Sequence, residues 1–131
     1  MKSYTDLEQS KKLAEILPLE SADMYYCYGM NIHTKGWSFD ETPTIIDNSN
    51  QIDIHTDIPC WSLAALLNVI PYTIHKSDNE FYRLGIDKGY NDYAVWYNNN
   101  GFTITDLDVA SDNFVDACCE MIIKLYEQKL L

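Results

Sequence analysis

The stretch that most constrains the fold lies between Asp57 and Pro71, where the chain carries no charged side chain. Its apolar positions are Trp61, Leu63, Ala64, Leu66, Leu67, Val69 and Ile70. A helix that is apolar on nearly every side belongs inside a protein, packed on more than one face. We therefore expect a central helix that begins at Pro59, is capped by Thr56 or Asp57, and ends before Pro71.

Two further helices are expected near the ends of the chain. Thr5 and Glu8 have the spacing of a capping box, and apolar residues at helical spacing follow them. We expect this first helix to cover residues 6–17 and to end at Pro18. A longer helix is expected at the C-terminal end, with an apolar stripe made of Phe114, Cys118, Met121 and Leu125. The residues that could cap it are Ser111, Asp112 and Asn113.

Alternating patterns and strand-favouring residues predict several strands. The predicted strands cover residues 24–33, 44–46, 72–75, 81–87, 93–98 and 102–106. An Asn100-Gly101 pair separates the last two, and it is a strong hairpin signal because both residues tolerate the positive φ of a type I′ turn. With this turn, Asn99 faces Phe102 and Tyr97 faces Ile104.

These elements predict an α+β fold. We expect a single antiparallel sheet of about four to five strands with helices packed on one face, in the order α-β-β-α-β-β-β-α. The length of 131 residues is near the commonest size of one domain. Residues 1–131 are therefore expected to form a single domain.

The charge of the chain limits its partners. Twenty acidic residues and nine basic ones give a net charge of −11, so the basic surface that direct nucleic-acid binding requires is missing. The segment from Trp37 to Asp57 contains no Lys or Arg and includes four acids that we select as a candidate partner-binding surface: Asp40, Glu41, Asp47 and Asp53. Two interpretations stay open, a role in solubility and an acidic face for a basic partner.

Cysteine usage and the N-terminal residues predict a cytoplasmic location. The N-terminal stretch is polar and lacks the apolar region of a signal peptide, and no apolar run is long enough to span a bilayer. The four cysteines lack metal-binding spacing, and we expect reduced thiols that mostly serve as small core residues. No glycine-rich phosphate loop occurs, and no cofactor or membrane partner is predicted.

Two groups of residues suggest catalysis as an alternative. On an extended strand Asp53, His55 and Asp57 would point the same way and could hold iron or manganese. Cys60 would sit near the N-terminus of the central helix, where backbone N–H groups lower the pKa of a thiol. The other interpretation is that Asp57 caps the helix and Cys60 is a buried, inert thiol, and the sequence favours it.

The chain is also unusually rich in aromatic residues, with ten tyrosines and three tryptophans. Tyr25, Tyr26 and Tyr28 cannot all face the same way on one strand. Two interpretations stay open: the rings form an exposed aromatic surface of the kind found at interfaces, or each ring packs under a helix with its hydroxyl at the rim.

Three segments carry a family resemblance: YTDLEQSKKLAEILPLESADM near the start, DIPCWSLAALLNVIP in the middle and DNFVDACCEMIIKLYEQKLL at the end. They resemble a family of short acidic proteins encoded by anaerobic gut bacteria and their phages or mobile elements. The resemblance implies a bacterial or phage-infected cytoplasm, and it carries over no catalytic residue, cofactor or ligand.

The leading hypothesis is a small cytoplasmic protein-binding module rather than an enzyme. Its partner would have a basic surface, and a homo-oligomer is also possible. In one specific form of the hypothesis, a mobile element uses the chain as an acidic decoy for a basic, nucleic-acid-binding host protein. The alternative is a small enzyme that uses Cys60 or an Asp53/His55/Asp57 metal cluster.

Overall fold

The computed structural model describes residues 2–77 and 80–131. The helices in this part of the chain are α1 (Leu7–Ala14), α2 (Leu63–Val69) and α3 (Phe114–Glu127), with a short 3-10 turn at Leu19–Ser21. The strands are β1 (Met24–Tyr26), β2 (Tyr28–Asn31), β3 (Gly36–Phe39), β4 (Thr44–Ile45), β5 (Ile58–Cys60), β6 (Thr73–Ser77), β7 (Glu80–Lys88), β8 (Tyr93–Asn99) and β9 (Phe102–Ser111).

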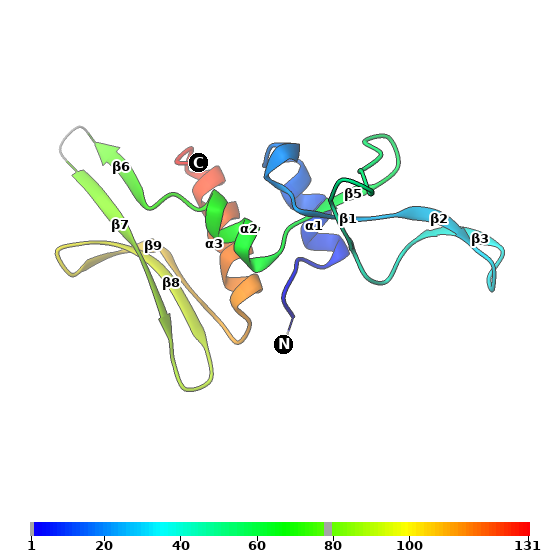
Figure 1. Cartoon of the computed structure of the whole chain (residues 1–131). Coiled ribbons are helices and arrows are strands. Elements are labelled where there is room, and N and C mark those ends of the chain that lie inside the picture. The colour runs from blue at the N-terminus through cyan, green and yellow to red at the C-terminus, as the bar shows by residue number, and fades with distance from the viewer. Residues whose placement is uncertain (1, 78–79) are drawn as a thin grey trace.

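The strands form three antiparallel sheets around a central group of helices (Figure 1). One sheet has four strands in the order β6-β7-β8-β9, and α3 packs against one of its faces. A three-stranded sheet has the order β4-β1-β5, and β2 and β3 form a separate two-stranded hairpin. This hairpin extends from the other end of the molecule, away from the four-stranded sheet.

The main core lies between the four-stranded sheet and the helices. Val95 and Tyr97 on β8 are fully buried beside Leu107 and Val109 of β9. The buried Tyr97 hydroxyl donates to the carbonyl oxygen of Pro71 at 2.5 Å, so the polar end of the ring is satisfied where α2 leads into β6. Burial also raises the pKa of this hydroxyl.

The predicted turn at Asn100-Gly101 is confirmed. Both residues have positive φ, 49° and 86°, and Asn99 pairs with Phe102. The register predicted further along is wrong, because a bulge follows the Asn98–Thr103 pair and the next paired residue, Trp96, lies opposite Asp108. Residues 104–107 of β9 fall within this irregular part of the pairing, and Leu107 and Val109 are buried in the core.

The α+β class is confirmed, but the single sheet and the element order are wrong. The observed order is α-β-β-β-β-β-α-β-β-β-β-α over the described residues. The predicted strand 24–33 is interrupted at Cys27: β1 pairs with β4 and β5, whereas β2 turns back and pairs with β3. Local pairing of β2 with its sequence neighbour therefore replaces extension of the main sheet.

The central helix starts later than predicted. Pro59 and Cys60 belong to β5, an edge strand in which a missing N–H is tolerated. Ser62 is the N-cap of α2, and its Oγ accepts from the N–H of Ala65 at 3.2 Å. Thr56 and Asp57 are therefore not caps, although the helix does end before Pro71 as expected.

The terminal helices are confirmed with changes at their ends, and α1 ends at Ala14 rather than continuing to residue 17 before Pro18. The capping box of α1 lies one residue further along, with Asp6 and Gln9 in place of Thr5 and Glu8. Thr5 is buried instead, so its hydroxyl serves the core. Asn113, one of the predicted candidates, caps α3 through a hydrogen bond from the N–H of Asp116 at 3.1 Å.

Candidate interaction surface

The β2–β3 hairpin has one apolar and one polar face. Tyr28 pairs with Phe39, and Met30 pairs with Trp37. Because paired residues and alternate residues share a face, these four side chains lie on the same side of the hairpin. Small or polar residues occupy the other side: Gly29, Asn31, Gly36 and Ser38.

The apolar face of the hairpin is open to solvent. Trp37 is 61% exposed and Met30 is 60% exposed. The rings of Tyr28 and Trp37 stack with centroids 5.9 Å apart, and Tyr28 also contacts Phe39 at 4.8 Å. Phe39 is half-buried and lies under Lys11 of α1, whose Nζ is 5.7 Å from the ring centroid. We define Tyr28, Met30 and Trp37 as the hairpin patch.

Asp57 supports the base of this hairpin. One of its carboxylate oxygens accepts from the N–H of Tyr28 at 3.0 Å, and the other accepts from the N–H of Asp53 at 2.8 Å. Residues 53–56 therefore form a turn rather than an extended strand, and the Asp53 carboxylate accepts from the N–H of His55 at 3.0 Å.

This turn does not support the metal-site hypothesis. The turn replaces the strand on which Asp53, His55 and Asp57 would have pointed the same way, and two of the carboxylates hold backbone groups. Within residues 2–77 and 80–131, no group of three or more His, Cys, Asp or Glu side chains is placed to hold a metal ion.

The four predicted partner-binding acids lie along the segments that lead from the hairpin to β5. Asp40 and Glu41 follow β3 directly, and all four side chains are exposed: Asp40, Glu41, Asp47 and Asp53. The ion pairs formed by the described residues include none of these acids. We define these four residues as the acidic rim.

Asp47 and Asp40, like Asp53, are held by local hydrogen bonds. The Asp47 carboxylate accepts from the side chain and the N–H of Ser49, both at 2.8 Å, and from the N–H of Asn50 at 2.9 Å. These bonds lower the pKa of Asp47, so the rim keeps this charge at neutral pH. The N–H of Asp40 donates to the carbonyl oxygen of Cys27 at 2.9 Å, which places Asp40 beside the break between β1 and β2.

Two acids of the rim, Asp40 and Asp47, act electrostatically on Tyr25 together with Asp57. Burial raises the pKa of the Tyr25 hydroxyl, and the nearby charges of Asp57, Asp47 and Asp40 raise it further. The same cause acts on Cys27, where burial and the charges of Asp57 and Asp40 raise the pKa of the thiol. Asp40 and Asp57 therefore both act on the segment where β1 ends and β2 begins.

Cys60, the candidate nucleophile, is buried and makes polar contacts with Thr5. The residue is fully buried, and its Sγ is 3.4 Å from both the hydroxyl and the carbonyl oxygen of Thr5. Burial raises the pKa of the Cys60 thiol, the opposite of what a nucleophile requires. The helix N-terminus that was expected to activate it begins two residues later, at Ser62.

The tyrosines divide between the two interpretations. Tyr25 and Tyr26 are buried, and the Tyr26 hydroxyl donates to the carbonyl oxygen of Thr5 at 2.8 Å. Tyr28 belongs to the exposed hairpin patch. The outer face of the four-stranded sheet is not a row of exposed rings, because the half-buried Trp96 lies flat against Gly85: a Cβ at Gly85 would come within 2.4 Å of that ring.

The hairpin is the feature that sequence reasoning missed, because residues 34–43 were not assigned a strand. The Lys35-Gly36 pair was a usable signal: Lys35 has φ 59°, and its N–H donates to the carbonyl oxygen of Asn31 at 2.7 Å. The alternation of Trp37 and Phe39 with Ser38 was a second signal, since aromatic residues favour strands.

Comparison of the chain with protein-family models, with curated proteins and with solved structures finds no match. Over the described residues, no helix is both long and apolar enough to cross a membrane.

Proposed function

We propose that the protein is a binding module for a protein partner with a basic surface. The hairpin patch would supply the apolar anchor, and the acidic rim at its base would supply the charge. The observation that carries the proposal is the exposed aromatic face of β2–β3, which two acids without ion pairs, Asp40 and Glu41, directly follow along the chain.

The hairpin patch fits an anchoring role because of what surrounds it. An isolated two-stranded sheet is only marginally stable in water, so an exposed apolar face on it is a cost that folding alone does not explain. Trp and Tyr are the residue types that most often dominate the energy of protein interfaces. Trp37 presents most of its ring, and the stacked Tyr28 holds it in place.

The acidic rim determines the kind of partner. Asp40 and Glu41 follow the last strand of the hairpin, so a protein that covers the patch meets their charges. No described lysine forms an ion pair with either residue. Complementary charge speeds association and selects against acidic partners, which favours a partner rich in Lys and Arg around an apolar site.

The setting implied by the family resemblance gives the proposal a specific form. In a bacterial cell that carries a mobile element, abundant basic proteins bind nucleic acid through Lys and Arg. An acidic chain with an apolar anchor would compete for such a surface, and the role of decoy follows from that competition.

Site-specific photo-crosslinking in bacterial lysate tests the proposal. A photoreactive residue replaces Met30 in the hairpin patch, and in a control protein it replaces the exposed Glu120 on α3. We expect a basic protein to be captured from position 30 and not from position 120. Capture should be lost in a Trp37→Ser background but kept in a Tyr90→Ser background, because Tyr90 is a fully exposed aromatic residue outside the hairpin.

Three outcomes would contradict the proposal. The first is equal capture from both positions, which would indicate nonspecific contact. The second is capture of acidic proteins. The third is capture of a second copy of the chain alone, which would indicate a homo-oligomer formed through the hairpin.

A further inference from the structure

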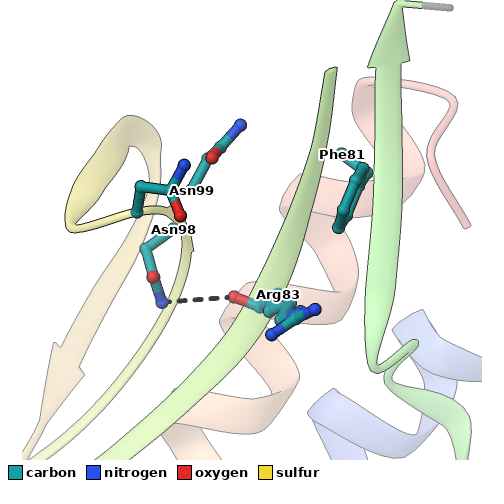
Figure 2. A pocket seen from close by; sticks show the side chains of 5 residues that line it. Phe81, Arg83, Asn98 and Asn99 are labelled. Carbon is teal, nitrogen blue, oxygen red and sulfur yellow. Dashed lines mark hydrogen bonds between the residues drawn. The ribbon is translucent and has the colours of Figure 1, made fainter. Parts of the chain in front are cut away.

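A separate surface hollow lies on the four-stranded sheet, at the opposite end of the molecule from the hairpin patch (Figure 1). Its volume is about 440 Å³, within the range of small-molecule sites. The residues that line it are Phe81, Arg83, Asn98, Asn99 and Asn100. Figure 2 shows Asn98 of β8 beside Arg83 of the neighbouring strand β7, with the hydrogen bond between them, and Asn99 next to Asn98.

Arg83 is the chain's only arginine, and it has no acidic partner among the described residues. This is notable because acids outnumber basic residues by 20 to 9. The guanidinium lies over the ring of Phe81, with Cζ 5.9 Å from the centroid. Such a contact orients the group without using its N–H donors, which stay available to a carboxylate or a phosphate.

Asn98, opposite Arg83 on β8, offers a hydrogen-bond acceptor where the guanidinium of Arg83 offers only donors. Nδ2 of Asn98 donates to the carbonyl oxygen of Arg83 at 3.4 Å, across the β7–β8 pairing. This bond directs the amide nitrogen toward β7 and leaves Oδ1 of Asn98 as an acceptor. The amides of Asn99 and Asn100 complete the lining and can both donate and accept.

We propose that this hollow binds a monosaccharide that carries one acidic group, either a carboxylate or a phosphate. The guanidinium of Arg83 pairs with the acidic group in the two-pronged geometry that arginine favours. The three amides exchange hydrogen bonds with sugar hydroxyls, and the exposed edge of Phe81 contacts the apolar C–H surface of the ring. The site is independent of the proposed protein-binding function, because it shares no residue with the hairpin patch or the acidic rim.

Calorimetry with the intact protein tests the assignment, using glucuronate, glucose 6-phosphate and glucose as probes. We expect at least one acidic sugar to bind at least about tenfold more tightly than glucose, since a charge-assisted pair contributes more than a neutral hydrogen bond. The tighter of the two acidic probes identifies the acidic group as carboxylate or phosphate. Acetate and inorganic phosphate should bind more weakly than the corresponding sugars, because they lack the hydroxyls that the amides recognise.

Two variants of β7 with the same change in charge separate the site from general electrostatics. Arg83→Gln should weaken binding of the acidic sugar by at least about tenfold. Lys88→Gln removes one positive charge from the same strand outside the hollow, and should change binding less than about twofold. Far-UV circular dichroism checks that both variants are folded.

The proposal is overturned if neither acidic sugar binds at millimolar concentration, or if glucose binds as tightly as both. It is also overturned if Arg83→Gln and Lys88→Gln weaken binding equally, because the effect would then come from net charge.

Discussion

Replacing Thr5 with valine should destabilise the protein although the two side chains have nearly the same shape. The Thr5 hydroxyl is buried and has three contacts: the N–H of Trp61 donates to it at 3.1 Å, the Ser10 hydroxyl lies 2.7 Å away, and it donates to Sγ of Cys60 at 3.4 Å. Valine removes the acceptor and leaves two buried donors, on Trp61 and Ser10, without this partner. Each buried donor left unpaired costs about 1–3 kcal/mol, so we expect a loss of about 2–4 kcal/mol in the free energy of unfolding.

Thr5→Ser is the matched control, because it keeps the hydroxyl and removes one methyl group. Its expected cost is about 1 kcal/mol, the value of one buried methyl or methylene. Urea unfolding followed by circular dichroism measures both variants, and valine should be the less stable of the two. If Thr5→Val is as stable as the wild type, or more stable than Thr5→Ser, the hydroxyl does not organise the junction of α1 and β5 as described.

Three further predictions concern the core, the thiols and the pH response. Leu66→Ala should lower the free energy of unfolding by about 3–5 kcal/mol and Leu67→Ala by less, because Leu66 is fully buried and Leu67 only half-buried. Urea titration of both variants measures the difference, and equal losses would contradict the packing of α2. Cys60, Cys118 and Cys119 should react with a thiol reagent only after the protein unfolds. Burial raises the pKa of all three thiols, to about 12 for Cys118 and Cys119. A Cys60 that reacts fast in the folded protein would restore the enzyme hypothesis. Burial alone would raise the pKa of Asp116, but hydrogen bonds from Lys2 at 2.6 Å and Gln9 at 2.7 Å outweigh burial and lower the pKa. The carboxylate therefore stabilises the folded protein above its unfolded pKa of about 3.9, and this stability is lost as the pH falls through the lower folded pKa. Asp116→Asn should therefore lower the free energy of unfolding at pH 7 by up to about 1 kcal/mol, given the partial exposure of the pair. It should have little effect once the pH is low enough to protonate the carboxylate in the folded protein. An effect that is independent of pH would refute the linkage.

The parts of the fold that could be predicted are those set by local chemistry. The Asn100-Gly101 turn follows from the backbone freedom of two residues, and the helix ends at Pro71 and Asn113 follow from capping and from proline geometry. That Val95 and Tyr97 share one face follows from alternation in β8. Each of these inferences needs only neighbours along the chain.

The errors arose where distant residues decide the local structure. Pro59 and Cys60 are in a strand because β1 pairs with them, and β1 lies more than thirty residues earlier in the chain. Thr5 is drawn into the core by Trp61, which moves the cap of α1 to Asp6. No local pattern distinguishes these outcomes from the predicted ones, because the residue types suit both.

The candidate sites were predicted unevenly for the same reason. The acids of the rim were selected from charge alone, and two of them, Asp40 and Glu41, directly follow a hairpin that the sequence reasoning did not predict. The aromatic interpretation was open at Tyr25, Tyr26 and Tyr28, and a break at Cys27 assigned the first two to the interior and the third to the surface. Arg83 attracted no attention in the sequence, because its significance depends on the asparagines across the sheet.

The most direct test of the protein-binding account compares two variants that lose the same four charges. In one, the acidic rim is neutralised by Asp40→Asn, Glu41→Gln, Asp47→Asn and Asp53→Asn, which keep the hydrogen-bond acceptors of the loops. In the other, four exposed acids outside the hairpin and its rim are neutralised by Asp87→Asn, Asp106→Asn, Asp108→Asn and Glu120→Gln. The measurement is the affinity of each variant for the protein captured through position 30, at low and at physiological salt.

The account predicts that the rim variant binds at least about fivefold more weakly at low salt, mainly through slower association, and that added salt reduces the difference. The control variant should bind within about twofold of the wild type under the same conditions. Equal weakening in both variants would show that only net charge matters. An affinity that ignores the rim and the salt would contradict the account, and would leave the acidity of the chain as a matter of solubility.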